Sequence, residues 1–246
     1  MPLPPEKRIK FFVFVVESPS PEDLYHRRSE GEIIRQAVNL NQIPCIVRTA
    51  VNLEAFEASL KIGLAEEMKR YEGMIPILHI SAHGNSEGVQ LSDKTVIPWA
   101  ILRQFLAPIN TALNHGLLIC LSCCEGYSGT RMAMFIEDEG YPFYAIVANS
   151  EEPLWSDTAV AYSAFYHLLS KGEFIVDAVK AMRIASGNQT FWVETAEYSR
   201  QGYLEYVKKV NVPAAQVQLE EKTSQEEPNH LAMLRKVGKE QVITDS

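Results

Sequence analysis

A chain of 246 residues, 46% of them hydrophobic, is long enough for one large domain with a sizeable core. The formal net charge of −8 excludes broad binding to a nucleic-acid backbone. No apolar run approaches the roughly 20 residues that a membrane span needs. The cysteines form neither a zinc motif nor a disulfide framework. We therefore expect a cytoplasmic protein that uses no metal or other cofactor and binds neither nucleic acid nor membrane.

Apolar, β-branched runs alternate with helical segments from the N-terminus to about residue 190. The first run is short and β-rich, which favours a core strand over a signal peptide. Strands are predicted over residues 9–16, 44–50, 75–81, 117–122 and 144–148. Helices are predicted over residues 29–40, 53–71, 130–138 and 157–186, with a further helix starting near residue 98. Because the apolar strands are continuous rather than alternating, we expect an α/β fold with a mostly parallel sheet flanked by helices on both faces.

The character of the chain changes after residue 210, where the sequence becomes polar and charged. We predict one domain over residues 1–210 and a flexible C-terminal tail over residues 211–246. One helix over residues 231–237 would fit within that tail.

Two of the predicted strands end in reactive side chains. The third run leads to His83 and the fourth to Cys123 and Cys124. Sites in parallel α/β sheets form beyond the carboxyl ends of strands, and neighbouring strands lie about 4.8 Å apart. With the strand order 2-1-3-4, a histidine and a thiol would face one substrate, which suits cysteine nucleophilic catalysis. The alternatives are a His-Gly turn and core thiols, and the residues alone do not decide between them.

The residues next to this pair have possible supporting roles. Gly84 leaves room for a substrate carbonyl, and its N–H would form an oxyanion hole with the N–H of Cys124. The helix after Cys124 could lower the pKa of a thiol, although residues 125–129 separate the two. Alternation along a strand would send Cys123 and Cys124 different ways, without showing which of them faces the histidine.

Four segments in a fixed order carry the strongest functional signal. They are His79-Ile-Ser-Ala-His83-Gly84, Leu121-Ser122-Cys123-Cys124-Glu125, Phe165-Tyr166 and Ala178-Val179. In this order they resemble the CHAT-type caspase-like cysteine peptidases, a group related to caspases and separases. The resemblance implies a caspase-like sheet with flavodoxin-like strand order, with Cys124 as the nucleophile and His83 as the catalytic histidine. It also implies a structural position for His79, a small packing residue at position 123, a protein or peptide substrate and a regulatory partner protein.

Acidic residues follow the fifth predicted strand. Glu151, Glu152 and Asp157 either line a pocket for a basic substrate side chain or form a solvated loop with a helix N-cap at position 156 or 157. Arg27 and Arg28 argue for an acidic substrate residue instead, unless they are exposed at a helix start. Substrate preference therefore stays open between a basic and an acidic residue.

The motifs together predict a cysteine endopeptidase that cleaves protein substrates through a Cys124–His83 dyad, with cleavage after a basic residue as one option. The alternative is a catalytically silent caspase-fold binding or scaffold module. Residues 149–151 keep this alternative open, because the family has Ser-Leu-Trp where this chain has Asn-Ser-Glu. A flavodoxin-like receiver would need an acidic cluster or a phosphate loop that the motifs do not supply.

Overall fold

The computed structural model describes residues 2, 4, 8–135 and 140–210. The chain divides into two compact units, Met1–Arg200 and Gln201–Ser246, and the sheet belongs to the first. The predicted tail over 211–246, with its helix over 231–237, lies outside the described residues. Within the described ranges, no helix is both long enough and apolar enough to cross a membrane.

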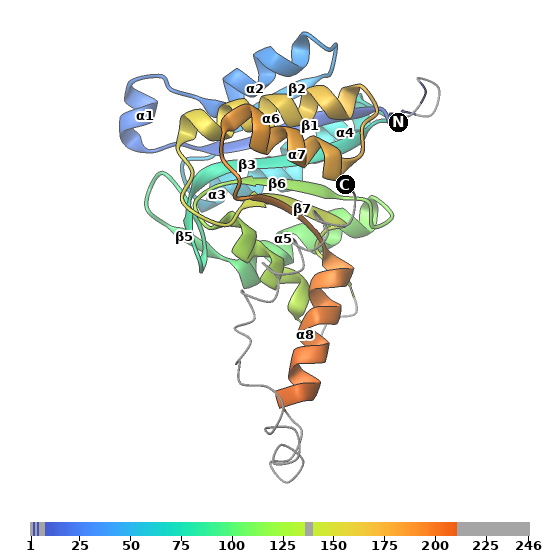
Figure 1. Cartoon of the computed structure of the whole chain (residues 1–246). Coiled ribbons are helices and arrows are strands. Elements are labelled where there is room, and N and C mark those ends of the chain that lie inside the picture. The colour runs from blue at the N-terminus through green and yellow to red at the C-terminus, as the bar shows by residue number, and fades with distance from the viewer. Residues whose placement is uncertain (1, 3, 5–7, 136–139, 211–246) are drawn as a thin grey trace. The chain divides into compact units, whose positions relative to one another are not determined.

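The first unit is built on a mostly parallel sheet with the path β2-β1-β3-β6-β7-β8 (Figure 1). The strands on this path are β1 Phe11–Ser18, β2 Cys45–Thr49, β3 Ile75–Asn85, β6 Leu118–Ser122, β7 Ala145–Asn149 and β8 Phe191–Thr195. The first five strands of the path are parallel, and β8 joins β7 in the antiparallel direction. When the five parallel strands are numbered by their order in the chain, their order across the sheet is 2-1-3-4-5. The predicted α/β class and flavodoxin-like order are therefore confirmed.

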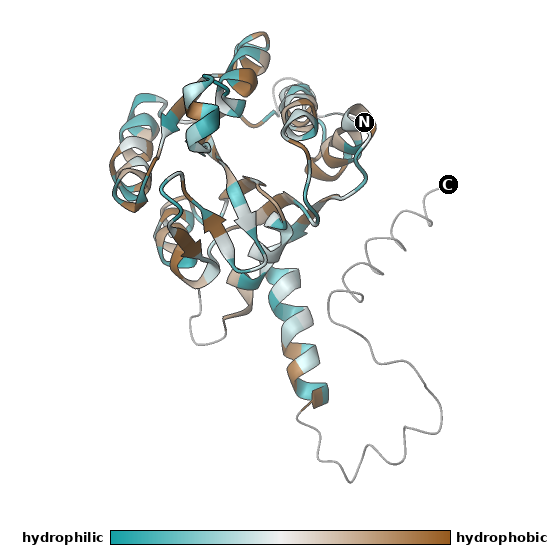
Figure 2. Cartoon of the chain, turned by 90° about the vertical axis from the view of Figure 1, so that its left-hand side faces the viewer, coloured by the Kyte–Doolittle hydropathy of each residue, from teal (hydrophilic) through white to brown (hydrophobic). Residues whose placement is uncertain are grey.

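Helices cover both faces of this sheet, as Figure 2 shows in a view turned by 90°. The helices are α1 Pro21–Tyr25, α2 Glu30–Asn39, α3 Leu53–Ala58, α4 Leu64–Arg70, α5 Trp99–Ala112, α6 Trp155–Ser170, α7 Ile175–Ser186 and α8 Ala196–Val210. On one face, Val13 and Val15 of β1 pack in a cluster with α2, α6 and α7. On the other face, Phe12 and Phe14 pack with α3, α4 and α5. Both faces of β1 are therefore buried, which explains its continuous apolar sequence.

Two predicted helices are interrupted. The predicted helix over 157–186 is wrong as one element, because it divides into α6 and α7 at Gly172, whose φ of 85° is left-handed. The predicted helix over 53–71 contains a π-helical turn, Ser59–Gly63, between α3 and α4. Apolar side chains keep a helical spacing through both regions, so periodicity alone does not reveal either interruption.

Two connections follow the carboxyl ends of the strands, and one of them differs from expectation. The predicted helix over 130–138 is instead a 3-10 helix, Gly126–Met134, and residues 136–139 lie outside the described part. The glycine-containing segment 84–96 forms β4 Gly88–Gln90, which pairs antiparallel with β3 and with β5 Val96–Pro98. A Cβ at Gly88 would lie 2.2 Å from the carbonyl oxygen of Ile97, so the pairing requires glycine.

Candidate active site

A cavity of about 460 Å³ opens at the carboxyl ends of β1, β3 and β6. Its wall includes His83 and Cys124, the two predicted catalytic residues. Ser81 of β3 lies opposite Ser122 of β6 in the parallel register, so His83 and Cys124 each follow that pair by the same number of residues. Neighbouring strands thus deliver an imidazole and a thiol to one cavity. A larger cavity of about 740 Å³ between α4 and α5 has no thiol, imidazole or hydroxyl among its described lining residues.

The β3–β4 hairpin positions His83. The carbonyl oxygen of Ser86 accepts hydrogen bonds from Trp99 Nε1 at 2.8 Å and from Arg131 Nη1 at 3.0 Å, which holds the hairpin in place. His83 lies opposite Gln90 in this hairpin, and its side chain is exposed. Among the described residues, its imidazole has no hydrogen-bond partner. The backbone of His83 is therefore fixed, while its ring is not oriented by a third group.

The two neighbouring cysteines have different surroundings. Strand β6 ends at Ser122, so strand alternation does not decide their directions. Cys123 is only 4% exposed, whereas Cys124 is half-buried. A Cβ at Gly84 would lie 3.0 Å from Cys123 Cβ and 3.1 Å from Cys123 Sγ, so the Cys123 side chain packs directly against this glycine. Cys124 is therefore the more accessible thiol of the pair.

The electrostatic surroundings of Cys124 raise its pKa. Burial contributes most, and the carboxylates of Glu152 and Glu125 add to it, while the backbone N–H of Cys124 itself opposes the shift. The pKa of Cys124 is thus raised overall, whereas the sequence predicts that the following helix lowers it. That segment is a 3-10 helix that begins at Gly126, closer to Cys124 than predicted, after Glu125, whose φ of 51° turns the chain. With its pKa raised, the Cys124 thiol is mostly protonated at neutral pH in this state. A thiol is nucleophilic only as the thiolate, so this state of Cys124 is weakly reactive.

Glu152→Gln is expected to make Cys124 more reactive. Removing this charge lowers the pKa of the thiol, so alkylation by iodoacetamide at pH 7 should be about two- to fivefold faster. The pH dependence of the alkylation rate measures the shift. Glu151→Gln is the matched control, because that adjacent exposed carboxylate does not contribute to the pKa of Cys124. Identical profiles for the two variants would contradict the assignment to Glu152.

The acidic residues predicted to bind substrate do not line the cavity. Glu151 and Glu152 are exposed, and Asp157 is half-buried. The same loop contributes Pro153, Leu154 and Trp155 to the wall instead. The carbonyl oxygen of Glu151 accepts a hydrogen bond from Glu125 N at 2.8 Å, which ties this loop to the one after Cys124. The N-cap expected at position 156 or 157 is wrong, because α6 begins at Trp155 with Leu154 as its cap.

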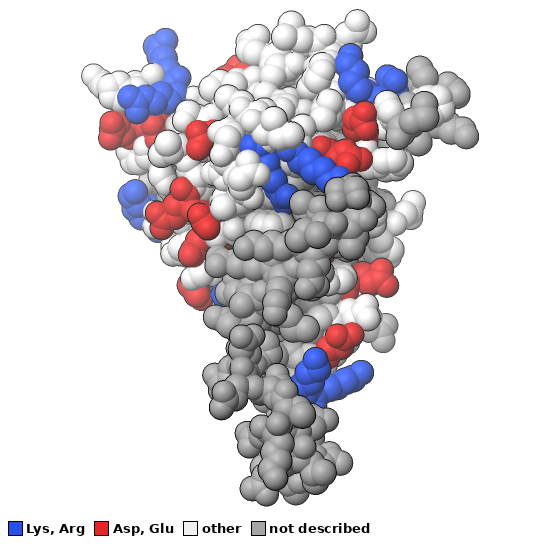
Figure 3. All heavy atoms as spheres, viewed as in Figure 1, with Lys and Arg blue, Asp and Glu red and all other residues white. Residues whose placement is uncertain are grey.

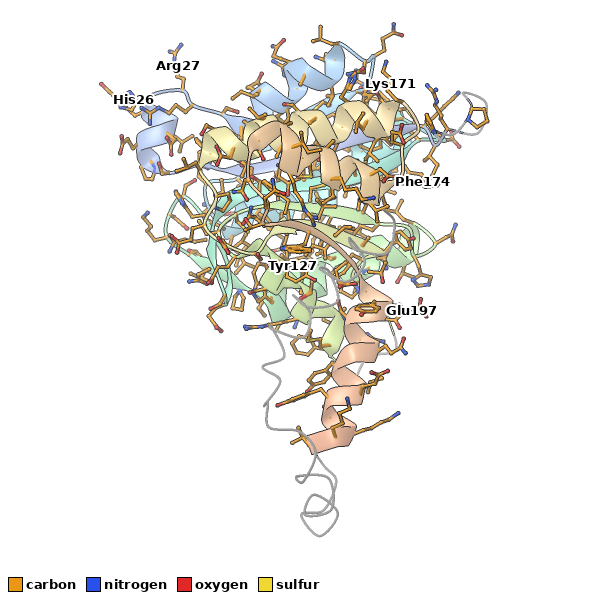
Figure 4. All side chains as sticks on the ribbon, viewed as in Figure 1. His26, Arg27, Tyr127, Lys171, Phe174 and Glu197 are labelled. Carbon is orange, nitrogen blue, oxygen red and sulfur yellow. The ribbon has the colours of Figure 1, made fainter. Side chains whose placement is uncertain are left out.

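The two arginines after β1 have separate positions. Arg28 lines the cavity, where its Nη1 lies 3.3 Å from Asp23 Oδ1, so its charge is compensated. Arg27 is exposed, and Figure 4 shows its side chain at the outer tip of the α1 segment, directed away from the sheet. On the face seen in Figure 3, basic and acidic side chains lie next to one another along the edge at which α1 lies. Neither arginine therefore offers an unpaired cation to the cavity.

A carboxyl group that the sequence motifs do not mark, that of Glu30, lies behind the cavity wall. It is only 2% exposed and accepts hydrogen bonds from Ser81 Oγ at 2.5 Å and Ser122 Oγ at 2.8 Å. Burial raises its pKa from 4.5 to about 7, against the opposing effect of the hydroxyl donors. In the sequence, Glu30 is simply the acidic residue after the helix cap Ser29. No local signal distinguishes it from a solvated first-turn glutamate.

The unusual Asn-Ser-Glu segment after β7 has a structural explanation. The Asn149 side chain is buried, and its Oδ1 accepts hydrogen bonds from Glu151 N at 2.8 Å and from Thr190 Oγ1 at 2.9 Å. This asparagine therefore fixes the turn after β7 and connects it to the start of β8.

The first histidine of the motif, His79, is part of the core. Its Nδ1 lies 2.9 Å from the Tyr166 hydroxyl, and its ring packs edge-on against Tyr162. Burial lowers its pKa to about 3, so it is neutral. Its place agrees with the structural position that the resemblance implied.

Among solved structures, the chain is similar to the complex of the Porphyromonas gingivalis RgpB pro- and mature domains, with 12% sequence identity and a TM-score of 0.47. The similarity covers 78% of this chain and 51% of that chain, so this chain spans about half the length of the neighbour. No family model and no curated protein matches the sequence.

Proposed function

We propose that this protein is a cysteine endopeptidase of the CHAT-type caspase-like kind. The observation that carries the proposal is that Cys124 and His83, from the ends of neighbouring parallel strands, line one cavity. In the reaction, His83 takes the thiol proton as Cys124 Sγ attacks the carbonyl carbon of the substrate. His83 then gives that proton to the leaving amine, and water releases the acyl group from the sulfur.

Two backbone N–H groups would stabilise the oxyanion of this reaction. The N–H of Cys124 lowers the pKa of its own thiol, so it favours negative charge at this position. Gly84 lies against the same segment: a Cβ at this position would be only 3.0 Å from the carbonyl oxygen of Cys124. Each oxyanion donor contributes on the order of 3 kcal/mol to catalysis. Gly84 and Cys124 thus have the oxyanion role in the proposal.

The proposal includes activation by a partner protein. Two features of the site support it: the raised pKa of Cys124 and the lack of an orienting partner for the His83 ring among the described residues. A partner with a basic group near Glu152 would lower the pKa of the thiol and increase the thiolate fraction. The partner would therefore act on the protonation state of the nucleophile.

A peptide acyloxymethyl ketone tests the dyad without requiring a known substrate. We expect it to label Cys124 in preference to Cys45, whose pKa burial raises to about 12. We expect labelling to be at least about tenfold slower in His83→Ala, because general-base help contributes about a hundredfold or more in such reactions. His26→Ala removes another exposed histidine and is the control. Unselective labelling, or labelling unchanged in His83→Ala, would contradict the dyad.

The second candidate is a caspase-fold binding module without turnover. The raised pKa of Cys124 is the observation that favours it, because a protonated thiol is a poor nucleophile. Such a module would bind peptides in the cavity while Cys124 reacts no faster than a free cysteine. The labelling experiment separates the two functions.

A further inference from the structure

A carboxyl group that no motif marks, that of Glu30, accepts a hydrogen bond from Ser122, which lines the cavity. We propose that Glu30 is a specificity-determining residue and that the cavity takes a basic side chain, lysine or arginine, of the substrate. This inference rests on the proposed function, since it names the substrate class of the same cavity.

Close packing of the start of α2 on the sheet brings Glu30 to this position. Ser29 caps the helix by accepting a hydrogen bond from Glu32 N at 3.0 Å, and Glu30 is the first helical residue. A Cβ on Gly31 would lie 2.8 Å from Val47 Cγ1 and 3.1 Å from Val15 Cγ1, so glycine permits this approach. The helix therefore holds the Glu30 carboxyl group against the ends of β3 and β6.

Two hydroxyl residues of the cavity wall act on Glu30. Ser122 Oγ donates to Glu30 Oε1 at 2.8 Å. The Thr158 hydroxyl lowers the pKa of this carboxyl group and donates to the carbonyl oxygen of Trp155 at 2.9 Å. Both Ser122 and Thr158 line the cavity. A hydroxyl that donates to a carboxylate keeps its lone pairs free to accept an N–H bond from a cation. An ammonium or guanidinium group in the cavity could thus reach the Glu30 charge through one layer of hydroxyls.

The balance of charges around the cavity also favours a cation. Within the described part of the chain, no basic side chain contributes to the pKa shift of Glu30, whereas another buried carboxyl group, that of Glu17, acts on it as a like charge. Glu17 is held by Ser29 Oγ at 2.6 Å and Gly31 N at 3.2 Å. In the wall itself, Arg28 is already paired with Asp23. A buried carboxylate without a cation is costly, so a basic side chain gains from this site and an acidic one is repelled.

Binding of small probes tests this inference independently of catalysis. Benzamidine carries the positive charge of an arginine side chain, and benzamide is its neutral counterpart. At pH 8, we expect benzamidine to bind the wild type at least about tenfold more tightly than benzamide by NMR titration. In Glu30→Gln the ratio of the benzamidine affinity to the benzamide affinity should fall close to one. Glu32→Gln, on the exposed side of the same helix, should keep the wild-type ratio.

Two results would overturn the inference: equal binding of both probes to the wild type, or a ratio that survives in a folded Glu30→Gln variant. Ser122→Ala provides a second variant should Glu30→Gln fail to fold. It removes the hydroxyl between Glu30 and the cavity, and we expect it to reduce the ratio. An unchanged ratio in Ser122→Ala would contradict the path through this hydroxyl.

Peptides that differ only in the residue before the scissile bond separate this inference from the proposed function. Cys124-dependent cleavage that is equally fast after lysine, leucine and aspartate would refute the role of Glu30 and leave the peptidase assignment intact. Selective benzamidine binding, together with acyloxymethyl ketone labelling that is unchanged in His83→Ala, would refute the peptidase assignment and leave the cation site intact.

Discussion

Cys124→Ala is expected to abolish peptide cleavage, while Cys123→Ala is expected to retain most of it. Cys124 is the half-buried thiol on the cavity wall, and its loss removes the atom that forms the acyl intermediate. Loss of a catalytic nucleophile typically lowers the rate by about a thousandfold or more. Cleavage of a lysine-containing peptide by the two variants and the wild type, side by side, measures the effect.

Cys123→Ala is the matched control because it removes the same atom type at the adjacent position. Cys123 packs against Gly84 and Gly126, so the missing sulfur leaves a small void that costs about 1 kcal/mol of stability. A small fall in melting temperature with cleavage preserved is therefore expected. Cleavage that survives in Cys124→Ala but disappears in a folded Cys123→Ala would assign the nucleophile to the other cysteine.

Glu30→Gln is expected to stabilise the protein at alkaline pH. Burial raises the pKa of Glu30 from 4.5 to about 7 in the folded state. The folded state therefore binds the proton more tightly than the unfolded state, and wild-type stability falls as pH rises from about 4.5 to about 7. Above that range the ionised carboxyl group costs about 3 kcal/mol, since one pKa unit corresponds to about 1.4 kcal/mol. Glutamine carries no charge and avoids this cost.

Urea unfolding at pH 8 and pH 5 measures this difference. The free energy of unfolding of Glu30→Gln should exceed that of the wild type by up to about 3 kcal/mol at pH 8, and by less than about 1 kcal/mol at pH 5. Glu32→Gln should show no such pH dependence, because its carboxylate is exposed. A Glu30→Gln variant that is destabilised at pH 8 would show that the folded protein favours the ionised carboxylate.

The two Glu30→Gln experiments together describe a trade-off. An acid that destabilises the fold at neutral pH, next to the cavity that holds Cys124 and His83, is what a functional role would require. Bound benzamidine should offset part of the cost of burying the ionised Glu30 carboxyl group. The probe and the mutation are thus both expected to stabilise the protein by relieving this buried charge.

The order of apolar runs and motifs along the chain is sufficient to predict the sheet and the neighbourhood of the site. Continuous apolar runs that alternate with helical segments predict parallel strands buried on both faces, and the observed order β2-β1-β3-β6-β7 agrees. Because parallel strands end at one edge, residues that follow two neighbouring strands must lie close together. For that reason the order of the runs brings His83 near the two cysteines, and the family resemblance selects Cys124. Both His83 and Cys124 line one cavity.

Two features depend on contacts between distant segments: which cysteine is accessible and which buried acidic residue lies behind the cavity wall. Cys123 is buried by its contact with Gly84, a residue of another strand. Glu30 is far from Ser122 along the chain, and only folding brings their side chains to 2.8 Å. Sequence patterns indicate on which face of its own helix or strand a residue lies. The burial and pKa of a polar side chain depend instead on groups that distant segments place around it.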